Sequence, residues 1–369
     1  MSVYSRLGVN RVINASFCLT FLGGSTLTKE VTDASLEANR CFVAMRDLDE
    51  KVGEVIAGIT GAEAAHVTSG AYCALALSTA ACIAGSDPDM MSKLPDTRGM
   101  KNEVLIQANL RTVFDRAVEV PGGKRVLVGD EDQGCTPEEL EGAITEKTAA
   151  IEYLPQLDPP RENVISLEEV IEIGHRHDVP IIVDAAGQTY PTGRLKMFVA
   201  MGADLVCYSG KYFGGPNSTG FVCGRKELME AVKENSFIGS HRTIGRGYKL
   251  DRQEIVALVV ALQRWMEMDH IKERLQPARR RRTNLMDALW KVPGVTLKVQ
   301  PYSYHVVGLQ VTLDKTPDET AEIVDNLRNG DPAIWVRRRR ENTIMMNTLF
   351  LDDGNEKIIV DRVKELLSR

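Results

Sequence analysis

Short apolar segments alternate with amphipathic ones through the middle of the chain, and this alternation constrains the fold more than any other feature. The apolar segments are rich in β-branched residues, as parallel strands covered on both faces are. The amphipathic segments open with helix-capping sequences: Thr136 precedes acidic residues, and Ser166 is followed by Glu169 three residues later. This pattern predicts an α/β domain with a doubly wound sheet between helices. The predicted strands are 103–108, 124–129, 149–154, 180–186 and 204–210, and the predicted helices are 136–145 and 166–178.

The pattern changes near residue 250, where longer helical segments and a different strand order begin. We therefore predict three parts: an N-terminal segment (1–40) that belongs cleanly to neither core, a large domain (41–250), and a small α+β C-terminal domain with its connecting helix (251–369). The expected elements after residue 250 are helices at 252–268, 272–292, 317–330 and 355–369, and strands at 295–300 and 305–313.

Composition excludes several function classes. A net charge of −6 gives no reason to expect nucleic acid as a partner, and the run Arg279–Arg282 is interpreted as a solvated helix face or a subunit contact. No apolar stretch reaches membrane-spanning length. The seven cysteines are dispersed, with no CxxC pair, so we expect a reduced cytoplasmic protein without a metal site.

Two polar residues stand at the ends of neighbouring predicted strands, where open α/β sheets place their sites. Asp184 ends "IIVD", and Lys211 follows the next strand inside the glycine-rich turn "SGKYFGG". One interpretation is a structural ion pair between them. The sharper one is a pyridoxal phosphate site, in which Lys211 forms the Schiff base and Asp184 pairs with the protonated pyridine nitrogen. Ala186 would present a small face on which the flat ring could lie.

The phosphate of such a cofactor needs a cradle. "HVTSGAYCALAL" reads as a strand end, then Ser69, Gly70 and Ala71, then a helix of small residues, and a helix N-terminus with a permissive glycine binds phosphate well. Ser209 could reach the same phosphate from the lysine turn. The cradle alone is a weak signal, but the order cradle, aspartate, lysine is specific.

These motifs resemble the fold-type-I pyridoxal phosphate enzymes, within them the branch that contains seryl-tRNA selenium transferase and D-glucosaminate-6-phosphate ammonia-lyase. The resemblance rests on "YSRLGVNRVINAS", "AAHVTSGA", "LPDTRGMKNEV", "VDAAGQ", "SGK…GGPNSTGFVCGRK" and "LRNGDPAIWVR", and covers nearly the whole chain. It implies a large domain with a mainly parallel sheet of the seven-stranded type and a small C-terminal domain. It also implies roles for individual residues: Lys211 as the catalytic lysine, Asp184, Ala186, Gln188, Ser69, Gly70, Ala71 and Ser209 in cofactor binding, and Arg337 as a clamp for a substrate carboxylate.

The sequence departs from this family at two places. The lysine turn reads Ser209-Gly210-Lys211, one residue shorter than the usual Ser-Gly-x-Lys. The residue that would stack on the outer ring face is left open among Asn109, Arg111 and Phe114. His66, in an apolar strand before the cradle, is interpreted as a packed core histidine.

The resemblance implies a lyase that performs α,β-elimination on a hydroxylated amino acid or amino sugar acid, giving a 2-oxo acid and ammonia. A racemase or epimerase is the alternative, since it needs only a second proton donor. Selenium transfer ranks low, because the chain begins almost directly at the shared motif and we expect no tRNA-gripping N-terminal domain. A non-catalytic relative is the remaining hypothesis. The family also implies a homodimer or larger homo-oligomer.

Overall fold

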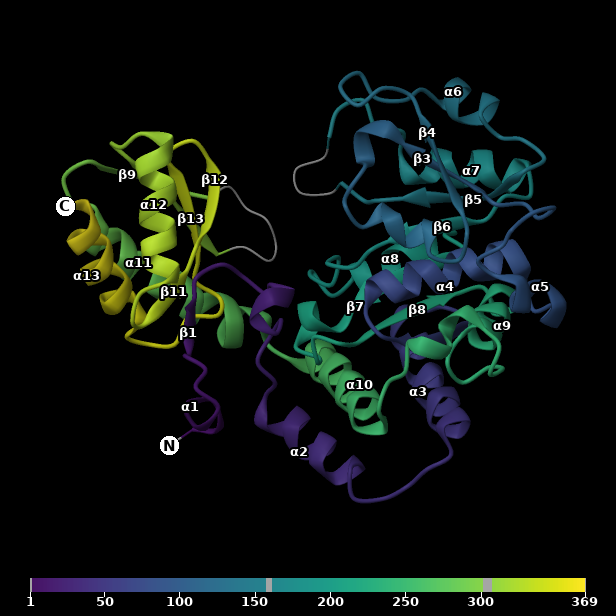
Figure 1. Ribbon diagram of the computed structural model, residues 1–369, viewed down its shortest axis with the longest axis horizontal. Coiled ribbons are helices and arrows are strands. Elements are labelled where there is room, and N and C mark those ends of the chain that lie inside the picture. The colour runs from purple at the N-terminus through teal and green to yellow at the C-terminus, as the bar shows by residue number, and fades with distance from the viewer. Residues whose placement is uncertain (1, 157–160, 301–306, 369) are drawn as a thin grey trace. The chain divides into compact units, whose positions relative to one another are not determined.

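The computed structural model describes residues 2–156, 161–300 and 307–368, and the chain forms two compact units (Figure 1). The larger unit is Ser25–Met266, and the smaller one combines Met1–Gly24 with Glu267–Arg369. These limits differ from the boundaries at 40 and 250 that the sequence pattern indicated. None of the helices in the described part of the chain is long and apolar enough to cross a membrane.

A seven-stranded sheet forms the centre of the larger unit, in the order β2-β8-β7-β6-β5-β3-β4. β8 runs antiparallel to both of its neighbours, and the other pairs are parallel. The carboxyl ends of the six remaining strands therefore lie at one edge of the sheet. The five predicted strands are all present, as β3 to β7. The strands are β2 (Ala64–Thr68), β3 (Glu103–Gln107), β4 (Lys124–Val128), β5 (Thr148–Tyr153), β6 (Ile181–Asp184), β7 (Leu205–Ser209) and β8 (Gly220–Gly224).

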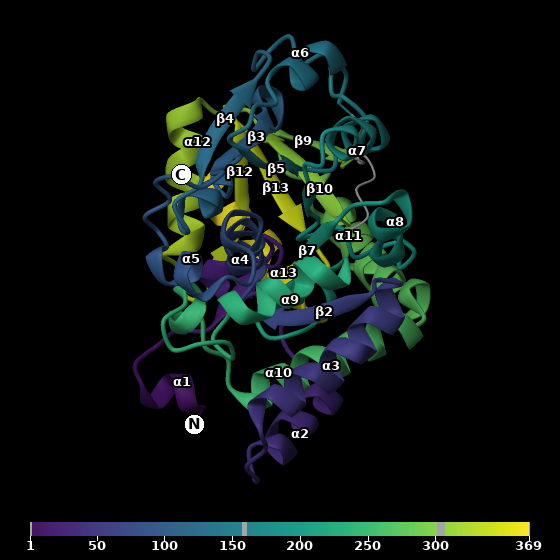
Figure 2. The same ribbon diagram turned by 90° about the vertical axis from the view of Figure 1, so that its right-hand side faces the viewer.

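Both faces of this sheet are covered, which explains why its strands are apolar without alternation. Within β7, Val206 packs into the core on one face, and its neighbour Cys207 packs into a second core on the other face with residues of α4 and α9. Figures 1 and 2 show α2, α3 and α10 along one side of the unit. The helices are α2 (Lys29–Ala38), α3 (Met45–Thr60), α4 (Ala71–Ala84), α5 (Pro88–Lys93), α6 (Pro137–Gly142), α7 (Leu167–Arg176), α8 (Arg194–Met201), α9 (Lys226–Asn235) and α10 (Arg252–Glu267).

Local sequence accounts for the helix starts. Thr136 and Ser166 each form the predicted capping box, in which the side chain accepts from the amide three residues on and a glutamate returns to the cap. Helix α10 was expected with the C-terminal domain. It lies in the larger unit because Ile255, Leu258 and Trp265 are buried in that unit's main core.

The smaller unit contains a four-stranded antiparallel sheet in the order β12-β13-β10-β9. The unit also contains a separate two-stranded sheet, in which β1 pairs in parallel with β11. Ile13 of β1 joins the apolar core of the unit. The segment 1–40, which we expected to belong cleanly to neither core, is divided: residues 1–24 belong to the smaller unit and residues 25–40 to the larger one. The elements are α1 (Val3–Arg6), β1 (Val12–Asn14), α11 (Gln276–Leu289), β9 (Val295–Val299), β10 (Gly308–Leu313), α12 (Pro317–Arg328), β11 (Ala333–Trp335), β12 (Arg337–Arg340), β13 (Thr343–Asn347) and α13 (Asn355–Leu367).

Two predicted elements of this unit differ at their starts. The strand expected at 305–313 begins at Gly308, and residues 305 and 306 lie outside the described residues. The helix expected at 272–292 opens with one π-helical turn, Ile271–Leu275, before α11.

Candidate active site

Lys211 lies on a single 3-10 turn, η4 (Gly210–Phe213), directly after β7. Two backbone hydrogen bonds fix this turn at Gly210: its N–H donates to Thr219 O at 2.8 Å, and its carbonyl accepts from Gly215 N–H at 2.8 Å. A Cβ at position 210 would lie 2.3 Å from Thr219 Oγ1, so only glycine fits there. The lysine is half-buried and is carried by backbone that has little freedom to move.

Asp184 ends β6, the strand next to β7, and its side chain is buried. Its Oδ1 accepts a hydrogen bond from Ala186 N–H at 3.1 Å. Burial raises the pKa of Asp184 to about 6, and the Ala186 hydrogen bond opposes this rise. No ion pair joins this carboxylate to a cationic side chain among the residues that the structure describes. A structural ion pair with Lys211 therefore does not explain it, and the site has an anionic group that lacks a cation.

Hydrogen bonds tie the loop after Asp184 to the lysine turn. Ser209 N–H donates to Ala186 O at 3.1 Å, and Thr189 Oγ1 donates to Tyr212 O at 3.3 Å. Gln188 Oε1 accepts from Arg194 Nη1 at 3.0 Å, so this side chain is held as well. The two predicted motifs therefore form one connected structure at the carboxyl edge of the sheet.

The predicted phosphate cradle lies at the same edge. Gly70 links β2 to α4 with φ +86°, a conformation that favours glycine, and no side chain caps the N-terminus of α4. The backbone N–H groups of its first turn thus remain available to an anion. The Ser69 hydroxyl, however, donates to Tyr248 O at 3.0 Å, so its proton is already engaged.

Gly220, the first residue of β8, joins the cradle to the lysine turn. It pairs with Thr68 on one side and with Ser209 on the other. A Cβ at this position would lie 2.7 Å from the Gly70 carbonyl carbon and 2.9 Å from Ala71 N. Ser209, the strand partner of Gly220 in β7, is also buried. The cradle, Asp184 and Lys211 are thus brought together.

The remaining predicted residues have different positions. Arg337 begins β12 in the smaller unit and is exposed, so its role as a substrate clamp stays a prediction. Asn109 lies in η2 (Ala108–Leu110), directly after β3, and Arg111 is 3.2 Å from Asp115 Oδ2. Phe114 follows the same strand and is exposed. His66 is fully buried with Nδ1 2.8 Å from Asp49 Oδ1, as a packed core histidine is.

Comparison with known proteins identifies the family. A model of the family "Aminotransferase class-V" matches residues 122–320. D-glucosaminate-6-phosphate ammonia lyase of Salmonella typhimurium (strain 14028s / SGSC 2262) is 30% identical over 99% of this chain and 98% of its own length. The chain belongs to the aminotransferase class-V family. The predicted resemblance is confirmed, and the protein is a member of a pyridoxal phosphate-dependent enzyme family with the fold-type-I fold.

Further similar proteins include one solved structure and two sequence relatives. The solved structure of D-glucosaminate-6-phosphate ammonia-lyase covers 100% of this chain and 98% of its own, with a TM-score of 0.87 and 29% identity. The 5'-C-glycyluridine monooxygenase-decarboxylase of Streptomyces sp is 31% identical over 99% of this chain and 92% of its own length. The L-seryl-tRNA(Sec) selenium transferase of Aquifex aeolicus (strain VF5) is 25% identical over 62% of this chain and 56% of its own. Members of similar identity thus have names that denote different reactions.

Two residues next to the predicted site residues were assigned no role from the sequence. Gly220 lies within the lysine motif "GGPNSTGFVCGRK" but was assigned no role, and its contact with the cradle depends on a strand pairing that the local pattern does not give. Glu152 lies in β5 among apolar residues, and it is buried. The acid inside "AAIEYL" was the signal that could have found it.

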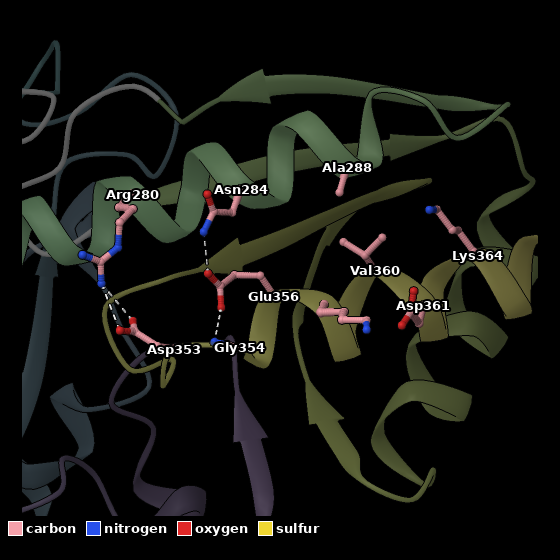
Figure 3. Close-up of a pocket in the computed structure, with 10 residues that line it drawn as sticks. Arg280, Asn284, Ala288, Asp353, Gly354, Glu356, Val360, Asp361 and Lys364 are labelled. Carbon is pink, nitrogen blue, oxygen red and sulfur yellow. Dashed lines mark hydrogen bonds and ion pairs between the residues drawn. The ribbon is translucent and has the colours of Figure 1, made fainter.

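A separate hollow of about 630 Å³ lies in the smaller unit between α11 and α13 (Figure 3). Two of its acidic residues have polar partners: Glu356 Oε1 accepts from Asn284 Nδ2 at 2.9 Å, and Asp353 pairs with Arg280 at 3.0 Å. Arg281 also contacts Asp353, so two arginines of the run Arg279–Arg282 form ion pairs within the chain, which the sequence did not predict. These pairs link α11 to the start of α13 and to the residue just before it.

Proposed function

We propose that this protein is a pyridoxal 5'-phosphate-dependent lyase that acts on a hydroxylated amino acid or amino sugar acid. Elimination of water across Cα and Cβ would give an enamine, which tautomerises to an imine and is hydrolysed to a 2-oxo acid and ammonia. The water lost in the first step is regained in the last, so the net change is the loss of ammonia. The observation that carries the proposal is the buried Asp184 carboxylate beside the lysine turn, with no ion-pair partner among the described residues, in a chain 30% identical to an ammonia lyase.

The residues of the site fit this cofactor. The α4 N-terminus and the Ser209 hydroxyl would hold the phosphate, and Asp184 would supply the negative charge opposite the ring nitrogen. Lys211 would attach the cofactor covalently through Nζ. Bound there, pyridoxal phosphate withdraws electrons and so acidifies the Cα proton of an amino acid. Once substrate has displaced it, Lys211 Nζ would take that proton, since a desolvated lysine can act as a base near neutral pH.

Ser69 is retained in the proposal with a modified role. Its hydroxyl proton is directed to Tyr248 O, so it would orient the loop before α4 and would contact phosphate only after rotating. Ala186 and Gln188 belong to the loop after Asp184 and would contribute to cofactor binding. Arg337 is proposed to bind the substrate carboxylate through two parallel N–H groups of its guanidinium.

The first test is the absorbance spectrum of the purified protein with pyridoxal phosphate, before and after borohydride. We expect a visible band that borohydride abolishes while fixing the cofactor to Lys211, located by peptide mass mapping. Lys211→Ala should lack the band. Lys226→Ala, at an exposed lysine of α9, is the matched control and should keep it. A wild-type protein that stays colourless would refute the proposal and favour a non-catalytic relative.

The second test separates the possible reactions. Hydroxylated D- and L-amino acids and amino sugar acids are incubated with the enzyme, and ammonia, 2-oxo acid, carbon dioxide and oxygen uptake are measured. The proposal expects ammonia and 2-oxo acid in equal amounts. Exchange of the Cα proton with solvent and loss of chirality, without ammonia, would indicate the racemase or epimerase instead. Oxygen uptake with carbon dioxide release would indicate a reaction like that for which the Streptomyces relative is named.

We also propose a homo-oligomer in the cytoplasm. Tyr72, Val113 and Phe114 are exposed apolar side chains on segments that follow strand ends at the site edge, where a second subunit could cover them. All seven cysteines are free thiols, which suits a reducing compartment. Sedimentation velocity of wild type and of Val113→Asp with Phe114→Asp would test the subunit contact, since the charged variant should dissociate.

A further inference from the structure

A second buried carboxyl group lies on the same face of the sheet as Asp184. Glu152 is the residue before the last of β5, and it pairs with Ile182 of the neighbouring strand β6. Side chains alternate along a strand, so Glu152, Ile182 and Asp184 share one face. The two carboxyl groups therefore come from adjacent strands and lie one pleat apart along the strand direction. This is the face that packs against α4, as the hydrogen bond between Ser78 and Cys207 at 3.6 Å shows.

Glu152 is enclosed by groups that cannot neutralise a charge on it. Its side chain is 7% exposed, and Oε2 is buried without a hydrogen-bond partner among residues 2–156, 161–300 and 307–368. Helix α4 carries no acidic or basic residue, and the neighbouring strand residue Ile106 is apolar. Burial raises the pKa of Glu152 well above its usual range, and the negative charges of Asp184 and Asp115 raise it further.

Within the described part of the chain, the cation that acts on Glu152 is Arg125, and it already binds other carboxylates. The Arg125 guanidinium lowers the pKa of Glu152, but its Nη1 is 2.7 Å from Asp115 Oδ1 and its Nη2 is 2.6 Å from Glu119 Oε1. The Cys207 thiol on the same face is kept neutral, since burial raises its pKa well above the usual range. A negative charge on Glu152 would therefore be unpaired. Protonation of the carboxylate removes the free-energy cost of burying that charge.

We propose that Glu152 and Asp184 form a buried pair that holds one proton, that this proton stays on Glu152, and that Asp184 is thereby left as the single anion of the site. The proposal rests on the proposed cofactor site. Glu152 acts through Asp184 and is a positioning residue: two ionised carboxyl groups in this face would oppose each other, and one would take up a proton. If that proton settled on Asp184, the ring nitrogen would lose its anionic partner.

Infrared spectroscopy of the apoprotein at pH 8 locates the proton. We expect the carbonyl band of a protonated carboxylic acid in wild type and in Asp184→Asn, and its loss in Glu152→Gln. Glu50→Gln, at an exposed glutamate of α3, is the matched control and should keep the band. A band that survives Glu152→Gln and disappears in Asp184→Asn would place the proton on Asp184 and overturn the proposal, and so would the absence of any such band.

Cofactor binding gives a second, independent readout. Because glutamine mimics a neutral carboxyl group, Glu152→Gln should bind pyridoxal phosphate within about twofold of wild type at pH 8, whereas Asp184→Asn should bind at least tenfold more weakly. A tenfold loss in a folded Glu152→Gln protein would show that the charge on Glu152 is needed, and would overturn the proposal. A wild-type protein that binds no pyridoxal phosphate would refute the proposed function, yet the infrared test would still decide where the proton lies.

Discussion

Gly220→Ala tests whether the close approach of the cradle and the lysine turn holds the site together. The added Cβ would lie 2.5 Å from Tyr208 O, 2.7 Å from the Gly70 carbonyl carbon and 2.9 Å from Ala71 N. All three atoms are backbone, so no rotamer change relieves the overlap, and β8 must move away from α4 or from β7. Overpacking of this kind costs about 1–3 kcal/mol.

That cost sets the size of the expected effects. In a domain of about 150–250 residues, such as the larger unit, a change of 1 kcal/mol shifts the melting temperature by about 2–4 °C, so we expect the apoprotein to melt roughly 2–12 °C lower. Displacement of the α4 N-terminus should also weaken the hold on an anion. Since a hydrogen bond to a charged group contributes about 1.5–3 kcal/mol, losing one would raise the dissociation constant of pyridoxal phosphate on the order of tenfold or more.

Differential scanning fluorimetry of the apoprotein and fluorescence titration with pyridoxal phosphate measure the two effects. Gly193→Ala is the control, because a Cβ there meets nothing within 4 Å and its φ is −57°. It should leave both quantities unchanged. If Gly220→Ala melted within about 1 °C of wild type and bound the cofactor equally well, the argument that this glycine couples cradle and lysine would be wrong.

Three further predictions follow from single contacts. In α3, Gly53→Ala should destabilise the protein by about 1–3 kcal/mol, because the added Cβ would lie 2.5 Å from Ala65 O. Gly58→Ala, whose Cβ would meet nothing within 4 Å, should stabilise it by about 0.5–1 kcal/mol. Urea unfolding should show changes of opposite sign in the free energy of unfolding. Burial raises the folded-state pKa of Asp184 from 3.8 to about 6, so the free energy of unfolding of the apoprotein falls as the pH rises across that window. Asp184→Asn should abolish this pH dependence. The variant should be about 3 kcal/mol more stable than wild type at pH 8 and no more stable at pH 4. Asp204→Ala should cost about 3–5 kcal/mol by chemical unfolding, since the buried carboxylate binds Arg225 Nη1 and Ile181 N–H, each at 2.8 Å; an effect below 1 kcal/mol would contradict this.

The parallel part of the sheet could be predicted from sequence because burial on both faces requires consecutive apolar residues within each strand. In β7, both faces pack into cores, so consecutive residues such as Val206 and Cys207 are apolar, and no knowledge of neighbouring strands is needed to recognise the strand. The cap residues Thr136 and Ser166 marked helix starts for the same reason, since a capping box is completed within four residues. Local determinants give local structure.

Features that depend on pairing between distant segments could not be predicted. The insertion of β8 between β2 and β7 puts Gly220 against Gly70, 150 positions earlier in the chain, and nothing in either segment indicates the other. The pairing of β1 with β11 likewise moved the N-terminal residues into the smaller unit. Helix α10 is mostly apolar in sequence, but the pattern does not say which of two cores it joins.

Explaining Glu152 requires both the local sequence pattern and the pairing of strands that are distant in sequence. The sequence placed an acid in an apolar strand, and burial of an unpaired carboxylate is costly enough that such a residue calls for an explanation. The explanation needs the register of β5 against β6, because a shift of one residue would turn Glu152 to the face opposite Asp184. With the observed register, Glu152 and Asp184 share one face of the sheet. Because their surroundings differ, Glu152 is protonated and Asp184 is ionised. Glu152 has apolar strand neighbours, two anions that act on it, and a cation, Arg125, that already binds other carboxylates. Asp184 ends its strand at the carboxyl edge of the sheet and receives the Ala186 N–H. The negative charge therefore settles on the carboxyl group that a cationic ligand can reach.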